Sequence, residues 1–210
     1  MKLSLYRILL AIALLYVAPC IMAQSNANDY MDKVIEQFSK SPSIMANFAI
    51  QGDTGSGIYM QGTIKMQGKK FCIETNDMTT WYDGKTMWTY APAIGEVNIT
   101  TPTRQELTEI NPYLILEDYK QSFITKELDS KQSGERQFRL TPTKRNTNIT
   151  NIILTVATSN KAPISFEILS NNNQRILVSI TNYNNNANIP QSVFTFDKNK
   201  YPQADIIDLR

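Results

Sequence analysis

Apolar residues that can share one face recur with a period of two along residues 45–50 and 58–66. This alternation is typical of β-strands with one buried face, because successive side chains of a strand point to opposite sides. The glycine-rich segment 52–57 and the tripeptide Gly68-Lys69-Lys70 predict tight turns that join sequential strands into an antiparallel meander. The residues that we expect on its inward face are Ala46, Phe48, Ile50, Ile58, Met60, Gly62, Ile64 and Met66, and Phe71, Ile73 and Thr75 continue as a further strand.

A hairpin and a series of further strands continue the pattern toward the C-terminus. The dipeptide Asp83-Gly84 suits a two-residue type I′ turn, and Trp81 and Trp88 flank it. About a dozen strands in total predict a mainly β domain with a few helices, built on one strongly curved antiparallel sheet. The further strands are expected at 96–101, 122–128, 136–142, 150–157, 163–170, 175–183 and 192–197.

Two segments have helical spacing instead. Residues 30–40 carry an apolar stripe and end before Pro42, and residues 104–117 follow a capping box formed by Thr103 and Glu106. Two short helices cover only part of so wide a sheet, so we expect an incompletely filled apolar cavity or groove. The alternative is an ordinary, well-packed core in which the same apolar residues need no ligand.

The N-terminus has the three-part layout of a secretory signal peptide. Lys2 and Arg7 precede an apolar run at residues 8–18, and Ala23 offers the cleavage site. The run is too short to span a bilayer comfortably, although an N-terminal membrane anchor is the alternative interpretation. We expect residues 1–23 to be removed and residues 24–210 to form a single domain in the periplasm.

Cys20 lies where a lipoprotein signal would carry its lipid-modified cysteine. Such a signal requires a small residue just before the cysteine and usually a leucine three positions back, whereas Pro19 and Val17 occupy these positions. We therefore interpret Cys20 as part of the removed segment. This interpretation favours a soluble protein over a membrane-tethered one.

Charge and composition argue against several classes of function. Removal of Lys2 and Arg7 leaves 19 basic and 19 acidic residues, a neutral balance that gives no sign of a nucleic-acid partner. The chain has no histidine, which removes the commonest general base and most zinc sites. We expect no enzyme activity, no catalytic residue, no metal and no cofactor. Cys72 would be the one remaining cysteine, and its apolar neighbours favour a buried thiol.

Three motifs follow one another along the chain. A glycine-led strand at 62–66 precedes Phe71, residues 81–90 read Trp-Tyr-Asp-Gly-Lys-Thr-Met-Trp-Thr-Tyr, and residues 194–208 hold an expected short strand before a Pro and Asp segment. Together with the N-terminal helix, these motifs resemble the LolA family of periplasmic lipoprotein carriers. The resemblance covers essentially the whole chain after residue 23 and is most specific in the Asp-Gly-Lys hairpin.

The resemblance implies both a fold and a function. The fold is an unclosed β-barrel with helices as a lid over a hydrophobic cavity. The function is to accept acylated lipoproteins from an inner-membrane ABC exporter, shield their acyl chains, and deliver them to an outer-membrane acceptor where one exists. Such a carrier uses no nucleotide itself, and we expect a monomer.

The residues that we expect to line the lipid-binding cavity are apolar and come from strands and helices alike. Met60 and Met66 suit a surface that binds and releases lipid, because the methionine side chain is flexible and polarizable. The full set is Phe48, Ile50, Ile58, Met60, Ile64, Met66, Phe71, Ile73, Trp88, Leu107, Ile110, Leu114 and Phe166.

One feature of the family is missing. An arginine often follows the glycine-led strand and helps to hold the lid closed, but residues 67–70 read Gln-Gly-Lys-Lys. We therefore do not carry that role over to this chain. Two alternative functions stay open at this point, an outer-membrane-tethered receptor of the same fold and a carboxylate-based cell-envelope enzyme. Glu106 and Glu109 have a same-helix spacing that fits capping better than catalysis.

Overall fold

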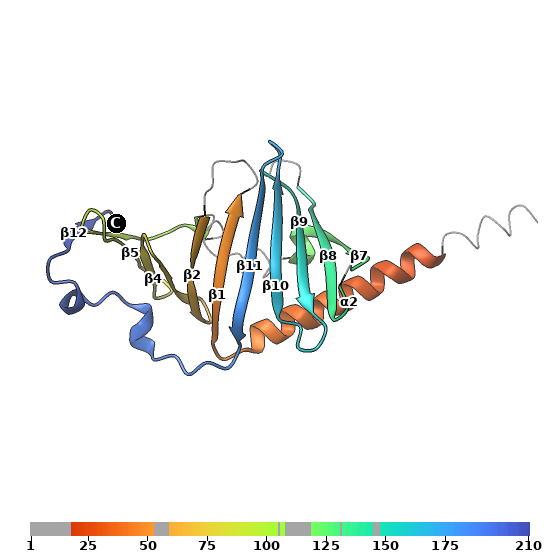
Figure 1. Cartoon of the computed structure of the whole chain (residues 1–210), viewed down its shortest axis with the longest axis horizontal. Coiled ribbons are helices and arrows are strands. Elements are labelled where there is room, and N and C mark those ends of the chain that lie inside the picture. Colours follow the sequence, from red (N-terminus) through yellow and green to blue (C-terminus); the bar gives the residue numbers. More distant parts are fainter. Residues whose placement is uncertain (1–17, 53–58, 105, 108–118, 131, 145–147) are drawn as a thin grey trace, which may run out of the picture.

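The computed structural model describes residues 18–52, 59–104, 106–107, 119–130, 132–144 and 148–210. About half of them belong to one 12-stranded sheet, shown in Figure 1. Its strands are β1 (Ile44–Gly52), β2 (Tyr59–Gln67), β3 (Lys70–Thr75), β4 (Thr79–Tyr82), β5 (Met87–Ala91), β6 (Glu96–Thr100), β7 (Phe123–Leu128), β8 (Glu135–Pro142), β9 (Ile149–Ala157), β10 (Pro163–Ser170), β11 (Arg175–Asn184) and β12 (Asp205–Asp208).

Two antiparallel meanders make up the sheet, and β1 joins them. The strand order is β12-β6-β5-β4-β3-β2-β1-β11-β10-β9-β8-β7, so strands β2–β6 and β7–β11 each run in sequence. β1 pairs antiparallel with both β2 and β11. Because β12 and β7 are the two ends of this order, the sheet is an unclosed barrel, as predicted. β12 was not expected, and it pairs with β6 in parallel.

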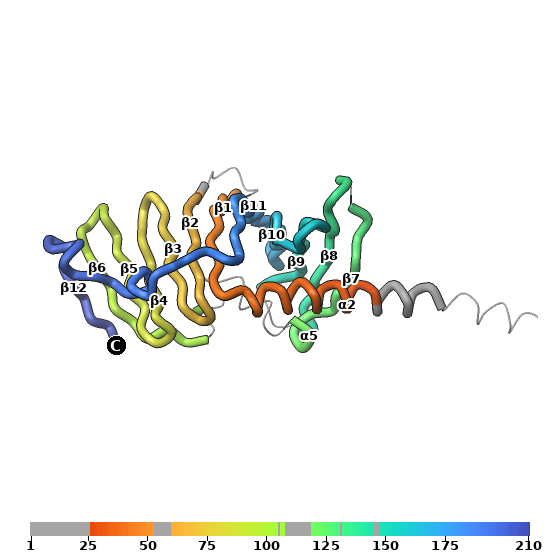
Figure 2. Tube along the Cα trace, turned by 90° about the horizontal axis from the view of Figure 1, so that it is seen from below, coloured from red at the N-terminus to blue at the C-terminus, as the bar shows by residue number. Residues whose placement is uncertain are grey.

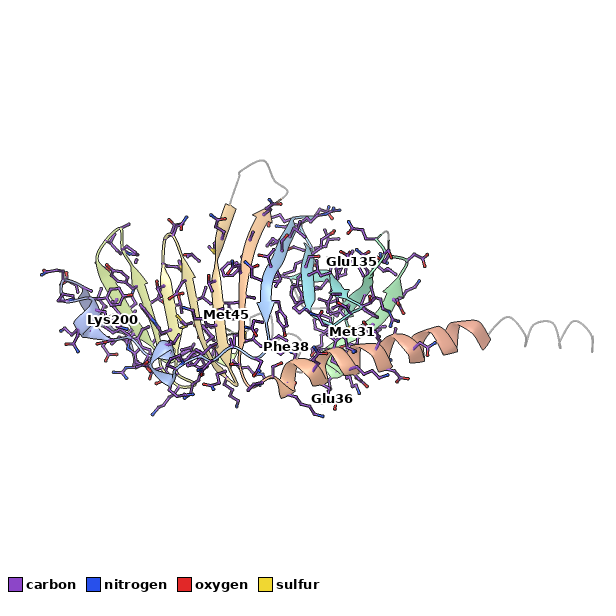
Figure 3. The ribbon with its side chains drawn as sticks, turned by 60° about the horizontal axis from the view of Figure 1, so that its bottom comes forward. Met31, Glu36, Phe38, Met45, Glu135 and Lys200 are labelled. Atoms are coloured by element: carbon purple, nitrogen blue, oxygen red, sulfur yellow. The ribbon has the colours of Figure 1, made fainter. Side chains whose placement is uncertain are left out.

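Helix α2 (Ala18–Lys40) covers one face of the sheet over β7–β10 (Figures 1 and 2). It begins before the predicted residue 30 and ends before Pro42 as expected. Figure 3 shows Met31 and Phe38 on the side of the helix toward the sheet, with Glu36 pointing away. Ala27, Met31 and Val34 are buried against a core that also contains Phe138, Leu140, Ile152, Leu154, Val156, Phe166 and Val178. We call this face of the sheet the inner face.

The C-terminal segment, residues 187–204, covers the opposite, outer face over β3–β5 (Figure 2). The strand predicted at 192–197 is wrong, because the 3₁₀ helix η1 (Gln191–Phe194) occupies its first part. A second 3₁₀ helix, η2 (Lys198–Lys200), follows. The apolar residues of this segment pack on the face of the sheet and not along its edge. The backbone of the segment therefore bonds within itself, for example from the Val193 amide to the Pro190 carbonyl.

The turn between β4 and β5 is not of type I′. The Asp83 carboxylate accepts hydrogen bonds from the backbone N–H groups of Lys85 and Thr86, both at 2.8 Å. The central residues are Gly84 and Lys85, and only Gly84 has a positive φ, 101°. A type I′ turn needs positive φ at both central residues. The aspartate side chain therefore sets the turn by binding its own backbone.

The predicted capping box at Thr103 is present. The Glu106 carboxylate accepts a hydrogen bond from the Thr103 amide at 2.7 Å, and the Glu106 amide donates to the Thr103 hydroxyl at 3.3 Å. These reciprocal bonds satisfy two backbone donors at a helix start. The rest of the helix predicted at 104–117 lies mostly outside the described residues.

Helix α5 (Tyr119–Ser122) is tied to α2 through Asp32. The Tyr119 hydroxyl donates to the Asp32 carboxylate, and the Lys120 ammonium lies 2.7 Å from Asp32 Oδ2. Burial acts to raise the pKa of Asp32, but the bonds from Lys120 and Tyr119 outweigh it and lower that pKa below its ordinary value of 3.8. Burial and the neighbouring carboxylate raise the pKa of Tyr119.

We expect Asp32→Asn to lower the free energy of unfolding at neutral pH and to have little effect in acid. A depressed pKa in the folded state gives stability that is present above 3.8 and lost as pH falls through the folded value. Because the Asp32 side chain is 38% exposed, the loss at neutral pH should be about 1 kcal/mol. Urea denaturation at neutral pH and in acid measures the loss, with Asp77→Asn in an exposed turn as the control. An equal loss at both pH values would contradict this role of the carboxylate.

Candidate functional site

A cavity of about 440 Å³ lies between the C-terminal half of α2 and the inner face of the sheet. Strands β1–β3 form one wall, and β10 and β11 form another. Val34, Ile35 and Phe38 of α2 contribute the side opposite the sheet. Small-ligand sites in proteins usually enclose about 300–1,000 Å³, so the cavity has the size of a binding site.

Strand register brings the apolar side chains of the wall together. Phe48 lies opposite Gly62 on β2 and opposite Ile180 on β11, and Ile50 lies opposite Met60 in the same way. Since side chains alternate across a strand, every second residue of these neighbours faces the cavity. The predicted inward alternation of β1 and β2 is therefore confirmed for the residues that the structure describes.

Gly62 lets the backbone of β3 and the ring of Phe48 approach β2 unusually closely. A Cβ atom at this position would lie 2.1 Å from the backbone carbonyl oxygen of Glu74 and 3.0 Å from the ring tip of Phe48. Only glycine fits such a space without movement of the neighbouring backbone. The ring of Phe48 thus lies over the bare glycine and forms part of the cavity wall.

The described residues among those predicted to bind lipid lie in three places: the cavity wall, the core beside the cavity, and the outer face of the sheet. Seven of them line the cavity: Phe48, Ile50, Met60, Ile64, Met66, Ile73 and Phe166. Phe71 is fully buried in a core cluster with Ile44, Met66 and Tyr82, and Leu107 packs against that cluster, so both lie beside the cavity. Ile58, Ile110 and Leu114 lie outside the described residues. Whether the lining residues contact acyl chains stays a prediction.

Trp88 lies on the outer face, away from the cavity. It is directly opposite Trp81 in the hairpin, and both pack in a cluster with Cys72 and Phe194. Met87, one residue earlier, packs against the inner cluster instead. The alternation of the strand thus places Trp88 under the C-terminal segment. Trp81 packs against the same segment, with its ring centroid 5.6 Å from those of Phe196 and Tyr201.

Several lining residues were not among the predicted set. Ile168, Ile176, Val178 and Ile180 belong to strands with clear alternation, which is the signal that could have identified them. Met78 and Lys161 lie in connections between strands, where no periodicity exists to place them. Gln37, Thr75, Thr80 and Tyr183 add polar atoms to an otherwise apolar lining.

Cys72 lies outside the cavity and has an unreactive setting. Its side chain is buried under the C-terminal segment, as its apolar sequence neighbours predicted. Burial, with a smaller effect of Glu74, raises the pKa of the thiol to about 12. The reactive form of cysteine is the thiolate, which this environment disfavours. Within the described ranges, no group of three or more Cys, Asp or Glu residues is arranged to hold a metal ion.

The family model described as outer membrane lipoprotein carrier protein LolA matches residues 20–172 of the 210-residue chain. The chain belongs to this family. The match covers α2 and strands β1–β10, which include most of the cavity wall. No curated protein matches the chain in sequence. No helix within the described part of the chain is long and apolar enough to cross a bilayer.

Solved structures are similar to this LolA family member at low sequence identity. An uncharacterized conserved protein from Thermus thermophilus is 10% identical, with a TM-score of 0.57 over 86% of this chain and 98% of that one. A DUF1329 family protein from Desulfovibrio piger is also 10% identical, with a TM-score of 0.50 over 82% and 97% of the two chains. A LolA superfamily protein from Nitrosomonas europaea is 13% identical, with a TM-score of 0.43 over 81% and 98%.

Proposed function

We propose that this chain is a soluble periplasmic carrier that binds the acyl chains of lipoproteins in its cavity and shuttles them from the inner to the outer membrane. The observation that carries the proposal is the apolar cavity of about 440 Å³ in a member of the LolA family. Its partners would be acylated lipoproteins, an inner-membrane ABC exporter and, where one exists, an outer-membrane acceptor. The carrier would act as a monomer and without a cofactor.

The composition of the cavity wall supports acyl chains as ligands. Each methylene that leaves water gains about 0.8 kcal/mol, so a chain of about sixteen carbons gains roughly 12 kcal/mol before any cost of binding. Eight isoleucines and three phenylalanines are among the 24 described residues that line the cavity. Met60, Met66 and Met78 add flexible side chains that can adjust to different chains and to an empty cavity.

Co-purification tests the proposal directly. The protein is isolated from the periplasm of cells in which delivery to the outer membrane is blocked, and bound proteins are identified by mass spectrometry. We expect acylated lipoproteins to accompany the wild-type chain and to be lost from a variant with a charge in the cavity, Ile64→Asp. A chain that carries no lipoprotein under this block would refute the carrier function.

Intact mass of the same preparation tests the export prediction. A mature N-terminus at Gln24, with no added lipid mass, is the expected result for a soluble carrier. A chain that begins at Cys20 with a diacylglyceryl mass would instead identify a tethered receptor.

A further inference from the structure

Lys161 is the one charged residue among the described residues that line the cavity. It lies in the connection between β9 and β10, two residues before Pro163, at one end of the cavity wall. The side chain is half-buried, and no carboxylate in the described part of the chain pairs with it. An ammonium group that loses water without a counter-charge is unfavourable, so this position is suited to an anionic partner.

The backbone at Lys161 is held in a conformation that lysine seldom adopts. Its φ is 54°, in the left-handed region that glycine and asparagine favour. The Lys161 amide donates to the Ala157 carbonyl at 2.8 Å, and the Ala157 amide donates to the Ala162 carbonyl at 2.9 Å. The connection is also fastened to α2, because Gln37 Nε2 donates to the Asn160 carbonyl at 2.5 Å. Such strain is often kept where a side chain has a function.

No charged residue lines the other end of the cavity within the described part of the chain, and most of its side chains are apolar. Ile168 and Ile176 form a cross-strand pair there, and Met78 and Ile176 are each 38% exposed. Along β10, the five steps from Pro163 to Ile168 span about 16 Å at about 3.3 Å per residue. The cavity therefore has a cationic end and an uncharged, mostly apolar end, which matches the two ends of an amphiphile.

We propose that Lys161 binds an anionic group, a carboxylate or phosphate, at the polar end of the acyl ligand. The inference rests on the proposed function in that it requires acyl chains in the cavity. It adds an orientation, with the tail toward Met78 and Ile176, and a selection for ligands with a negative charge next to the chain. Three sources offer this chemistry: a free fatty acid, a phospholipid headgroup, and an acidic side chain next to the acylated cysteine of a lipoprotein.

Matched ligands that differ only in charge test the proposal. Hexadecanoate and hexadecanol compete with a fluorescent acyl probe for the wild-type chain, for Lys161→Asn and for the control Lys126→Asn on the exposed side of β7. We expect the wild type and the control to bind the carboxylate about fivefold more tightly than the alcohol. Lys161→Asn should bind both equally, because asparagine tolerates the positive φ but carries no charge. The preference of the wild type should also shrink in high salt.

Lys161→Gly separates a ligand role from a structural one. Glycine adopts a positive φ without strain, so this variant should unfold at a higher urea concentration than the wild type while losing the preference for the carboxylate. If Lys161 instead stabilises the fold, Lys161→Gly should unfold at a lower urea concentration than the wild type. Equal binding of carboxylate and alcohol by the wild type, or an equal loss of both in Lys161→Asn, would overturn the proposal and leave the carrier function intact. Failure of every acyl ligand to bind would overturn both.

Two further ligand pairs identify the source of the charge. The first is a lysophospholipid with an anionic headgroup against one whose headgroup is zwitterionic. The second is a diacylated cysteinyl peptide with Asp against Asn after the cysteine. The pair with the largest ratio in the wild type, and no preference in Lys161→Asn, names the natural class.

Discussion

Replacing Ile64 with aspartate is expected to lower the affinity for an acyl probe by about 100-fold, or about 3 kcal/mol. Ile64 lies on the inner face of β2 between its cross-strand neighbours Ala46 and Ile73, which also line the cavity. A bound acyl chain would have to strip water from the new carboxylate, and no cation in the adjoining strands faces it. Displacement of a fluorescent fatty acid from the purified protein measures the change.

Gln61→Asp is the matched control. Gln61 is exposed on the outer face of the same strand and faces away from the cavity. The same charge there should leave affinity within about twofold of the wild type, because surface substitutions have small effects. Circular dichroism establishes that both variants fold. A folded Ile64→Asp chain with wild-type affinity would show that acyl chains do not use this cavity.

The residues of the inner face on β1 and β2 could be predicted because only one register of these strands buries their large apolar side chains. Phe48 and Ile50 are the large apolar residues at every second position of β1, and a shift of register by one residue would turn them outward and bury Asn47 instead. The same reasoning located Met60, Ile64 and Met66. Helix α2 followed from its apolar stripe, although its start did not, because Ala27 is buried within a polar stretch.

In the hairpin of β4 and β5, the alternation of residues does not identify which side chains face inward. Both faces of this part of the sheet are covered, so Met87 and Trp88 are both apolar and only one of them can face inward. The cover on the outer face is the C-terminal segment, more than 100 residues away in sequence, as in the hydrogen bond between Lys70 and Gln191 with its separation of 121. Nothing local to Trp88 indicates that cover.

Long-range pairing limits prediction in the same way. β1 joins the two meanders by pairing with β11, and β12 pairs with β6 in parallel, and neither partner lies nearby in the sequence. Loop residues of the cavity are harder still. Lys161 was not identified because a residue between strands has no periodicity, and its position depends on the bond between Gln37 and Asn160.

The C-terminal segment gives the largest expected effect on stability. Phe194 is completely buried against Cys72 and Trp81 on the outer face. Phe194→Ala would leave a cavity beneath the segment and should lower the free energy of unfolding by about 3–5 kcal/mol. Urea denaturation measures the loss, and Thr195→Ala at the neighbouring exposed position should change stability by less than about 0.5 kcal/mol.

The reactivity of Cys72 shows whether Phe194→Ala detaches only the C-terminal segment or unfolds the whole sheet. In a chain that lacks residues 1–23 it is the single thiol, and it is only 1% exposed beneath Phe194. If the segment detaches while the sheet stays folded, maleimide should modify Cys72 in Phe194→Ala at denaturant concentrations where the wild type is protected. Modification that follows global unfolding in both proteins would mean that the segment and the sheet unfold as one unit. Unchanged stability and unchanged labelling together would contradict the packing of this segment on the outer face.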